Sequence, residues 1–325
     1  MKTSLSLLLL LLLLPAISLR AQSGGEPPIQ ALFWNLENFF DYRDDGLSDS
    51  DREFSSFGAK RWTKKRFYAK CRLIAKALLW IGDSLDGEMP DWIGVAEVEN
   101  AFVLRRLLQG DALKKLHYRI VHFESPDPRG IDVALLYRSD RWRCLSAKPC
   151  HVMLGDSLLR TRDILQVRLT RGNDTLDVLV NHHPSKFGGA VVSGPRREAA
   201  VRTLRQLADS LSTCGPGRIL AFGDFNDTPQ NPIYRDLLSQ RLINLSDSLE
   251  RKGRGTIRYQ GKWELIDQAF VSASLSGRAQ MEIIEVPFLM TRDGTHPGDK
   301  PLRTYEGPRY KGGVSDHCPI VVTIR

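Results

Sequence analysis

The alternation of short apolar runs and polar turns along the chain predicts an α/β fold. Strand-length apolar runs lie at residues 29–34, 90–97, 118–123, 131–137, 164–169, 175–180, 219–222, 265–271 and 320–324. Helical spacing of apolar residues predicts helices within 60–78, over 101–116 and from 194 to about 211, and a short helix after 229. Turn residues at 126–130 and 172–174 join neighbouring strands into two hairpins. Hairpins that alternate with a few long helices favour mixed sheets with helices outside.

Three segments show neither the apolar spacing of a helix nor the apolar run of a strand, and they are predicted to be loops. Residues 42–58 are rich in Asp, Ser and Gly, residues 251–262 in Gly, Arg and Lys, and residues 291–313 in Gly, Pro and charged side chains. Long irregular segments inside compact domains are often functional. We therefore expect residues 291–313 to gate a binding cleft.

Residues 1–21 have the pattern of a secretory signal peptide. Lys2 is followed by eight consecutive leucines at 7–14, and small residues lie close to Ala21. A retained membrane anchor is the alternative, but the apolar stretch is short for a membrane span. Leu19 fits the small-residue cleavage pattern poorly, which leaves the cleavage position open. We expect a secreted or periplasmic protein that has one large domain at residues 28–325 and no stable membrane insertion after signal removal.

Composition adds a charge preference and excludes thiolate metal sites. The chain is 42% hydrophobic and 26% charged, with a formal net charge of +8, which favours a polyanionic partner without identifying one. Its five cysteines show no Cys-x-x-Cys spacing, which argues against a zinc or thioredoxin-like site. Cys144 and Cys150 could close a small loop, but a core of this size does not require a disulfide. Residues 60–76 carry eight basic residues, which we interpret as the solvated face of a helix.

Polar residues at the ends of the predicted strands carry the candidate chemistry. After the strand at 219–222, Gly223 is followed by Asp224 and Asn226, which point to one face of an extended segment. Alone, this pair is typical of a surface turn. Similar residues recur at other strand ends, and together they suggest one site that holds a hard cation and a phosphate. The complete set is Asn35, Glu97, His182, Asp224, Asn226, Asp267, Asp316 and His317.

Six ordered motifs resemble the endonuclease/exonuclease/phosphatase superfamily of deoxyribonuclease-like phosphoesterases. They are Trp-Asn-Leu-Glu-Asn, Val-Ala-Glu-Val-Glu-Asn, Val-Asn-His-His-Pro-Ser-Lys, Gly-Asp-Phe-Asn-Asp, Leu-Ile-Asp-Gln and Ser-Asp-His-Cys-Pro-Ile, and they extend from about Gln30 to the end. The resemblance implies a four-layer α/β/β/α sandwich of two mixed sheets with outer helices. It also implies that residues 28–325 form a catalytic domain with its cleft at the strand ends.

The resemblance further implies roles for the strand-end residues. The matching positions of Asn35 and Glu97 imply ligands of a divalent cation, Mg²⁺ or Mn²⁺. Those of Asp224, Asn226 and Asp316 imply contacts with phosphate, nucleophilic water or a second ion, so Asp316 is also a predicted metal ligand. His182 and His317 would flank the scissile phosphate, and Asp267 would orient His317. Whether His317 or Asp224 accepts the proton of the water stays open.

Other polar residues in the motifs have less specific interpretations. Lys186 and Asp132 are predicted to contact substrate, with a structural role as the alternative for each. Glu37, Glu99 and Asp41 are expected to support the fold around the site.

We therefore expect a secreted, metal-dependent phosphodiesterase that is a monomer and acts on a nucleic-acid backbone. A phosphomonoesterase or a lipid or inositol phosphoesterase is the first alternative, because one fold serves many esters. A non-catalytic polyanion-binding protein is the second, but it predicts missing ligands, and all the ligands of the motifs are present.

Overall fold

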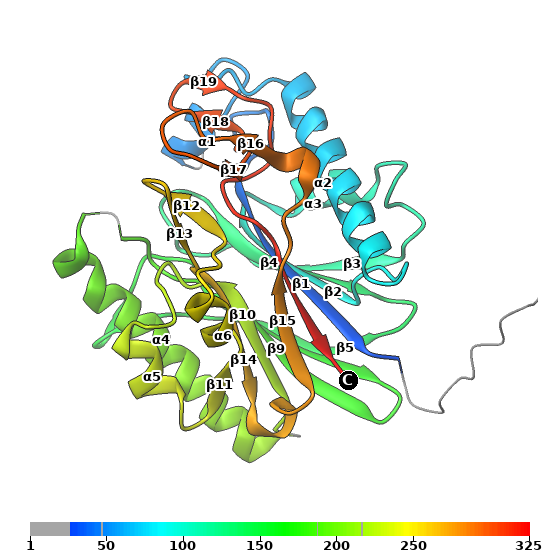
Figure 1. The fold of residues 1–325 in the computed structure, drawn as a ribbon, viewed down its shortest axis with the longest axis vertical. Coiled ribbons are helices and arrows are strands. Elements are labelled where there is room, and N and C mark those ends of the chain that lie inside the picture. Colours follow the sequence, from blue (N-terminus) through cyan, green and yellow to red (C-terminus); the bar gives the residue numbers. More distant parts are fainter. Residues whose placement is uncertain (1–26, 47, 187, 216) are drawn as a thin grey trace, which may run out of the picture.

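Two six-stranded mixed sheets form the centre of the protein (Figure 1). The structure is a computed structural model that describes residues 27–325 except 47, 187 and 216. The predicted signal peptide at 1–21 lies outside these described residues. None of the described helices is both long enough and apolar enough to cross a membrane.

The first sheet has the order β15-β20-β1-β2-β4-β3. Its strands are β1 (Ile29–Phe39), β2 (Trp92–Val98), β3 (Tyr118–His122), β4 (Asp132–Arg138), β15 (Ala279–Ile283) and β20 (Ile320–Ile324). The central pair β1 and β2 is parallel, whereas the other pairs are antiparallel. The predicted hairpin of β3 and β4 is confirmed.

The second sheet repeats this plan with the order β11-β14-β10-β9-β8-β5. Its strands are β5 (Arg143–Cys150), β8 (Ile164–Arg171), β9 (Asp174–His182), β10 (Ile219–Asp224), β11 (Leu242–Asn244) and β14 (Asp267–Ser272). Again the central pair, β9 and β10, is parallel. The predicted hairpin of β8 and β9 is also confirmed.

The two sheets pack face to face around an apolar layer. Phe33 of β1 meets Phe222 of β10 edge to face, with ring centroids 5.8 Å apart. Gly94 of β2 makes room for this contact, because a Cβ there would lie 2.9 Å from the Phe222 ring. Close packing of this kind fixes how the strand ends of one sheet face those of the other.

Helices cover both outer faces and complete four layers. The apolar stripes of α2 (Lys64–Ser84) and α3 (Ala101–Leu108) pack on the first sheet, and those of α4 (Ala190–Cys214) and α5 (Pro232–Leu238) pack on the second (Figure 1). Thr63 and Asn100 cap the amino-terminal ends of α2 and α3 by accepting backbone N–H groups. The predicted α/β/β/α sandwich is confirmed.

Two predicted helices have different bounds in the structure. Helix α4 begins at Ala190, four residues before the predicted start, and contains Pro195. Proline favours the first turn of a helix, and this preference led to the later start. Helix α3 ends at Leu108, and the chain continues to residue 116 in turns.

The three predicted loops contain short ordered elements. Residues 42–58 include α1 (Asp49–Glu53), and residues 247–264 form α6 (Asp247–Arg251) and the hairpin of β12 (Ile257–Tyr259) with β13 (Lys262–Glu264). Residues 290–310 form two small hairpins, β16 (Met290–Arg292) with β17 (Asp299–Pro301) and β18 (Tyr305–Glu306) with β19 (Arg309–Tyr310). The remaining elements are β6 (Met153–Leu154), β7 (Ser157–Leu158) and 3₁₀ turns at Ala273–Leu275 and Pro287–Leu289.

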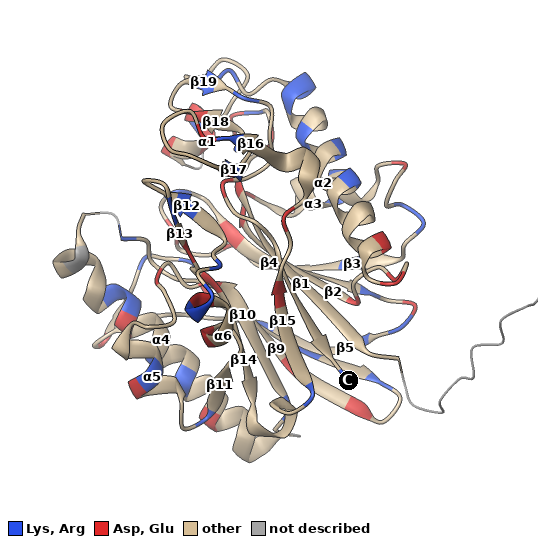
Figure 2. Ribbon diagram, viewed as in Figure 1, with Lys and Arg blue, Asp and Glu red and all other residues tan. Residues whose placement is uncertain are grey.

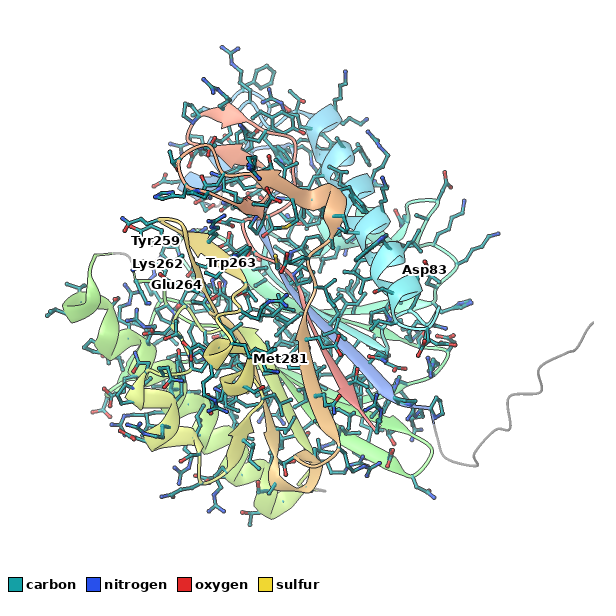
Figure 3. All side chains as sticks on the ribbon, in the orientation of Figure 1. Asp83, Tyr259, Lys262, Trp263, Glu264 and Met281 are labelled. Carbon is teal, nitrogen blue, oxygen red and sulfur yellow. The ribbon has the colours of Figure 1, made fainter. Side chains whose placement is uncertain are left out.

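The β12–β13 hairpin lies beside the last sequence motif. Ile257 forms an isolated β-bridge with His317, and Cys318 donates its backbone N–H to the Thr256 carbonyl at 2.8 Å. Figure 3 labels Tyr259, Lys262, Trp263 and Glu264 on this hairpin. The five cysteines are all free, in agreement with a fold that does not depend on disulfides.

Candidate active site

The ends of the two parallel strand pairs bring the predicted residues together. Asn35 pairs in register with Ala96, one residue before Glu97, and Asp224 pairs with His182. Carboxyl ends of parallel neighbours meet at one sheet edge, so each sheet delivers two polar side chains to the same place. Of the eight described non-glycine residues with positive φ, four lie at these ends: Glu37, Asn38, Glu97 and Asn226. This uncommon backbone geometry turns the chain sharply where the side chains are needed.

Asp224 is the hub of the site. Its Oδ2 accepts a hydrogen bond from Asn35 Nδ2 at 3.0 Å, which links the two sheets. The same oxygen lies 3.5 Å from His182 Nε2 and 3.9 Å from His317 Nε2. Glu97 Oε1 lies 4.0 Å from His182 Nε2 on the other side. The structure thus brings the two imidazoles and the predicted acids of both sheets into one cluster.

Asp267 holds His317 in place. His317 Nδ1 lies 2.8 Å from Asp267 Oδ2. Burial alone would lower the pKa of His317, but Asp267 and then Asp224 and Asp316 raise it well above its ordinary value. His317 is therefore an imidazolium at neutral pH, with Nε2 facing Asp224 and able to donate a proton.

His182 has the opposite protonation state. Burial, with smaller contributions from Arg162 and Arg129, holds the pKa of His182 well below its ordinary value, so the ring is neutral. Burial also raises the pKa of Asp224 to about 7, and the bonds from Asn226 and Asn35 oppose this rise. Groups whose surroundings push their pKa values apart can divide the acid and base roles of a reaction between them.

The C-terminal motif is tied directly to the first strand. Trp34 Nε1 donates to the His317 carbonyl at 2.9 Å, and Ser315 Oγ donates to the Asn35 carbonyl at 2.6 Å. The Ser315 hydroxyl also accepts the His317 backbone N–H at 3.0 Å. These bonds fix His317 relative to Asn35 although the two residues lie at opposite ends of the sequence.

Two arginines that sequence reasoning missed stand beside the predicted metal ligands. Arg129 Nη2 lies 3.5 Å from Glu97 Oε2 and donates to Asn38 Oδ1 at 2.8 Å. Arg303 Nη2 lies 3.0 Å from Asp316 Oδ2 and 2.8 Å from Glu37 Oε1. Both side chains are about two-fifths exposed, at 41% and 42%. Each lies in a predicted turn or loop. These segments have no repeating pattern of apolar and polar residues that could show which side chains reach the site.

A buried lysine completes this side of the site. Lys70 of α2 donates to the Glu37 carbonyl at 2.6 Å and to Thr304 Oγ1 at 2.8 Å. Burial lowers its pKa to about 8, although the nearby Glu37, Glu97 and Asp316 raise it. The spacing from Phe67 could have indicated a buried position, because residues three apart share a helix face. The interpretation of this basic segment as the solvated face of a helix is therefore wrong for Lys70, which is buried.

The donor set suits a hard divalent cation. The acids and amide at the strand ends offer oxygen atoms, and Asp267 Oδ1 is buried with no hydrogen-bond partner among the described residues. Ligand atoms of Asp224, Asp267 and His317 lie within 4.8 Å of one another, but the charged imidazole of His317 is a poor ligand. Glu97, Asn35 and Asp316 are therefore the residues that would hold a divalent cation, whose charge would neutralise a bound phosphate.

Two of the predicted residues, Asn226 and Lys186, have other partners. Asn226 donates its amide to the His183 carbonyl at 3.0 Å and its backbone N–H to Asp224 Oδ1 at 2.8 Å, so it positions the hub. Lys186 lies 3.2 Å from Asp227 and is half exposed at the rim. Its contact with substrate and a direct catalytic role of Asn226 stay predictions.

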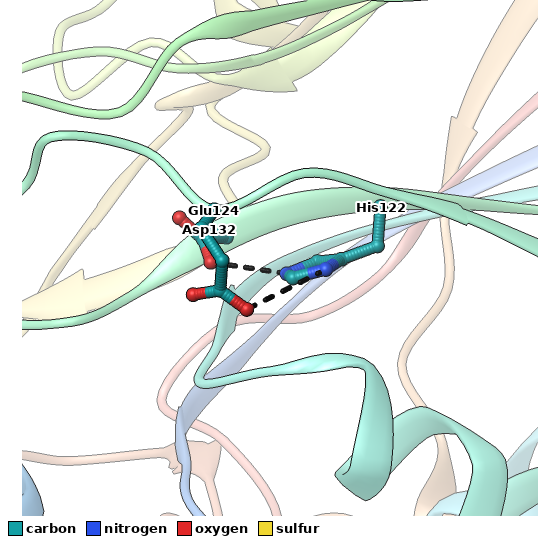
Figure 4. A group of neighbouring side chains, drawn as sticks. All are labelled: His122, Glu124 and Asp132. Carbon is teal, nitrogen blue, oxygen red and sulfur yellow. Dashed lines mark hydrogen bonds and ion pairs between the residues drawn. The ribbon is translucent and has the colours of Figure 1, made fainter.

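Asp132 lies outside the cluster and belongs to a neighbouring group. His122 Nε2 lies 3.0 Å from Asp132 Oδ2, and Glu124 approaches the other ring nitrogen (Figure 4). The second oxygen of Asp132 accepts the Ser125 backbone N–H at 2.8 Å. Asp132 is only 2% exposed, so its contacts favour the structural alternative, in which it fixes the loop that carries Arg129.

A four-layer sandwich with acids, amides and imidazoles at its strand ends is the arrangement of metal-dependent phosphoric ester hydrolases. A model of the endonuclease/exonuclease/phosphatase family matches residues 30–325, and the chain belongs to this family. It is accordingly an enzyme of the metal-dependent phosphoric ester hydrolase class.

Solved structures share the fold at low sequence identity. The chain is similar to D. rerio TDP2 complexed with a single-strand DNA product, with 15% identity, a TM-score of 0.56, and coverage of 92% of this chain and 100% of that chain. It is similar to the human Nocturnin catalytic domain with bound sulfate, with 16% identity, a TM-score of 0.57, and coverage of 92% and 95%. A family protein from Bacteroides thetaiotaomicron has 14% identity, a TM-score of 0.55, and coverage of 92% and 98%. Comparison with curated protein sequences gives no significant match.

Proposed function

We propose that the protein is a secreted or periplasmic phosphodiesterase that uses Mg²⁺ or Mn²⁺ to hydrolyse a nucleic-acid backbone. The observation that carries this proposal is the placement of two imidazoles around Asp224: His182 Nε2 lies 3.5 Å and His317 Nε2 3.9 Å from Asp224 Oδ2, and His317 Nδ1 lies 2.8 Å from Asp267 Oδ2. Residues 1–21 would direct export, and the mature chain would act as a monomer without membrane insertion.

In the proposed mechanism, the two imidazoles and Asp224 have different roles. Asp224, whose pKa is raised, accepts the proton of the attacking water. His317 donates its proton to the leaving-group oxygen as the ester P–O bond to that oxygen breaks, so the product leaves as an alcohol. Neutral His182 donates a hydrogen bond from Nε2 to a non-bridging oxygen. Asn35 and Asp267 hold Asp224 and His317 in the orientations that these transfers require.

Basic side chains around the cluster support a polyanionic substrate. Arg129, Arg303 and Lys186 flank the site, each between two-fifths and half exposed. Basic residues also line α2 and α4 (Figure 2). Nucleic acids bind such surfaces through their phosphates, so affinity should fall with added salt. The TDP2 complex with a single-strand DNA product shows that a similar fold accommodates this type of molecule.

A panel of substrates tests the proposal. Plasmid DNA, RNA, sphingomyelin vesicles and inositol phosphates are incubated side by side with the protein and Mn²⁺, and with the Asp224→Asn variant as the inactive control. We expect nucleic-acid cleavage that a chelator abolishes and that Mg²⁺ or Mn²⁺ restores. Cleavage of inositol phosphates alone would refute the nucleic-acid proposal, and chelator-insensitive DNA binding without hydrolysis would favour a binding protein.

One surface feature favours a lipid phosphoester as a second candidate substrate. The β6–β7 hairpin exposes Met153, Leu154 and Leu158 by nearly half of each side chain, although its sequence contains no aromatic residue. An apolar hairpin can enter the interface of a lipid bilayer. If sphingomyelin vesicles are cut, a Met153→Ser, Leu154→Ser variant should lose activity on vesicles but keep activity on a soluble ester.

A further inference from the structure

Three carboxylates form a cluster separate from the candidate active site. Asp45 lies in the turn after β1, Asp51 in α1, and Glu99 directly after β2. Each offers an oxygen atom, and these three atoms lie within 4.8 Å of one another. They join two segments of the chain that lie side by side, because Asp41 donates its backbone N–H to Glu99 Oε2 at 2.7 Å.

Two of these acids are buried, and one of their oxygens is left without an N–H or hydroxyl donor. Asp51 is 2% exposed and Glu99 is 7% exposed. Asp51 Oδ2 accepts the backbone N–H groups of Asp45 at 2.8 Å and Gly46 at 3.0 Å. Asp51 Oδ1, however, is buried and accepts no hydrogen bond from an N–H or hydroxyl group of the described residues, and the side-chain neighbours of this carboxyl are the carboxyls of Asp45 and Glu99. A buried carboxylate oxygen with no such donor is unfavourable unless a cation or a proton compensates its charge.

The excess of negative charge around this cluster also favours the binding of a cation. Residues 41–53 contain six acidic and two basic residues in a chain that is basic overall, and acidic residues gather around α1 (Figure 2). Arg43 is near, but it pairs with Asp41 at 2.8 Å and stacks over Phe102 at 4.3 Å. No lysine or arginine in the described part of the chain has its side chain within ion-pair distance of Asp51 or Glu99. Burial, with Asp45 adding to it, raises the pKa of Asp51 to about 6.

We propose that Asp45, Asp51 and Glu99 bind a structural Ca²⁺ ion, distinct from the catalytic cation. Calcium accepts six to eight oxygen ligands in flexible geometry, and backbone carbonyls and water complete such sites. Magnesium demands a stricter octahedron, which a loop with acids at irregular spacing matches less well. Gly46, with φ of 75°, allows the tight turn that brings Asp45 back toward Asp51.

A cation here would stiffen the support of the active site. It would tie residues 41–53 to the end of β2, two residues from Glu97. Ser48 Oγ of the same segment donates to the Arg129 carbonyl at 3.1 Å. The bound ion therefore holds the carriers of Glu97 and Arg129 in position without touching the substrate.

Calcium titration of the full protein and three variants tests this site. Calorimetry and thermal melts in Ca²⁺ are measured for the wild type, Asp51→Asn, Glu97→Gln and Asp49→Asn. Asp49 is exposed in the same helix, so its variant removes the same charge outside the cluster. We expect Asp51→Asn to weaken Ca²⁺ binding at least tenfold and to abolish the rise in Tm, whereas Glu97→Gln and Asp49→Asn keep both.

Thermal melts without calcium distinguish loss of Ca²⁺ binding from a folding defect. If Asp51→Asn melts cooperatively without calcium but no longer responds to it, the site is supported. If that variant does not fold, Glu99→Gln replaces it in the same titrations. Equal Ca²⁺ responses in the cluster variant and Asp49→Asn would overturn the proposal, because the ion would then bind elsewhere. No Ca²⁺ response in Glu97→Gln would also overturn it, because the ion would then bind only in the active site.

Discussion

The acidic side chains at the two sheet edges that face each other across the site have different basic partners. On the second sheet, Asp224 and Asp267 are buried and lie against the imidazole of His317. On the first sheet, Glu97 and the adjoining Asp316 lie closer to solvent and against the guanidinium groups of Arg129 and Arg303. Imidazoles exchange protons near neutral pH, whereas guanidinium groups keep their charge.

This difference indicates a division of labour within one small site. We propose that the buried edge moves protons, since the pKa of His317 is raised and that of His182 is lowered there. The more open edge is built to hold fixed charges, since its arginines can exchange a carboxylate partner for a phosphate. Changes on the two edges should therefore have different kinetic signatures.

The largest effect is expected from His317→Ala on the buried edge. Loss of a general acid should lower turnover by about 10²–10⁴-fold with little change in KM. Single-turnover kinetics on the preferred substrate measure this directly. Asp267→Asn sharpens the test, because it keeps the imidazole but removes the carboxylate that raises its pKa.

The direction in which Asp267→Asn moves the pH profile follows from the effect of Asp267 on the pKa of His317. His317 must be protonated to donate, and its pKa should fall when Asp267 loses its charge. The alkaline limb of the pH profile should then move to lower pH. An unchanged profile together with full activity in His317→Ala would remove the acid role from this imidazole.

A smaller effect is expected from Arg129→Ala on the open edge. A charge-assisted hydrogen bond contributes roughly 1.5–3 kcal/mol, so substrate affinity should fall about 10–100-fold while turnover changes less. Arg129→Lys should restore part of the affinity, and Arg235→Ala, which removes an exposed charge on α5, serves as the control. A loss of turnover at unchanged KM would place Arg129 with the proton-transfer groups instead.

The smallest effect concerns stability and comes from Lys70 beneath the open edge. The pKa of Lys70 in the folded protein, about 8, is below the ordinary lysine value of 10.5, so the unfolded chain binds more protons between these two pH values. Stability should therefore rise from pH 8 toward pH 10.5 through this group. Denaturant titrations should show that Lys70→Met loses this slope, whereas Lys65→Met, exposed on the same helix, keeps it. Equal slopes in both variants would contradict a buried, neutralised amine.

The sequence was sufficient for the fold and for most of the cluster. Apolar runs located nearly all central strands, and the ordered motifs placed Asn35, Glu97, Asp224 and His317 at strand ends that the structure brings together. The edge strands β5, β11 and β15 were not predicted, because none of them has the apolar run of a core strand.

Side chains that reach the site from irregular segments could not be predicted. Arg129 and Arg303 lie in loops, and only the folded chain shows which basic residues turn inward. For Asp132 the sequence leaves substrate contact and a structural role as alternatives, and its partners in the structure, His122 and Ser125, favour the structural role but are not marked by any local pattern. Burial of Lys70 depends on how α2 rotates against the first sheet.

The bonds between Trp34, Ser315 and His317 have a consequence for biosynthesis. A growing polypeptide carries β1 long before the residues that dock on it have been translated. Until those last residues leave the ribosome, neither the imidazolium nor its anchors exist, and no hydrolytic centre can assemble. The site can therefore form only after the C-terminal strand has been synthesised.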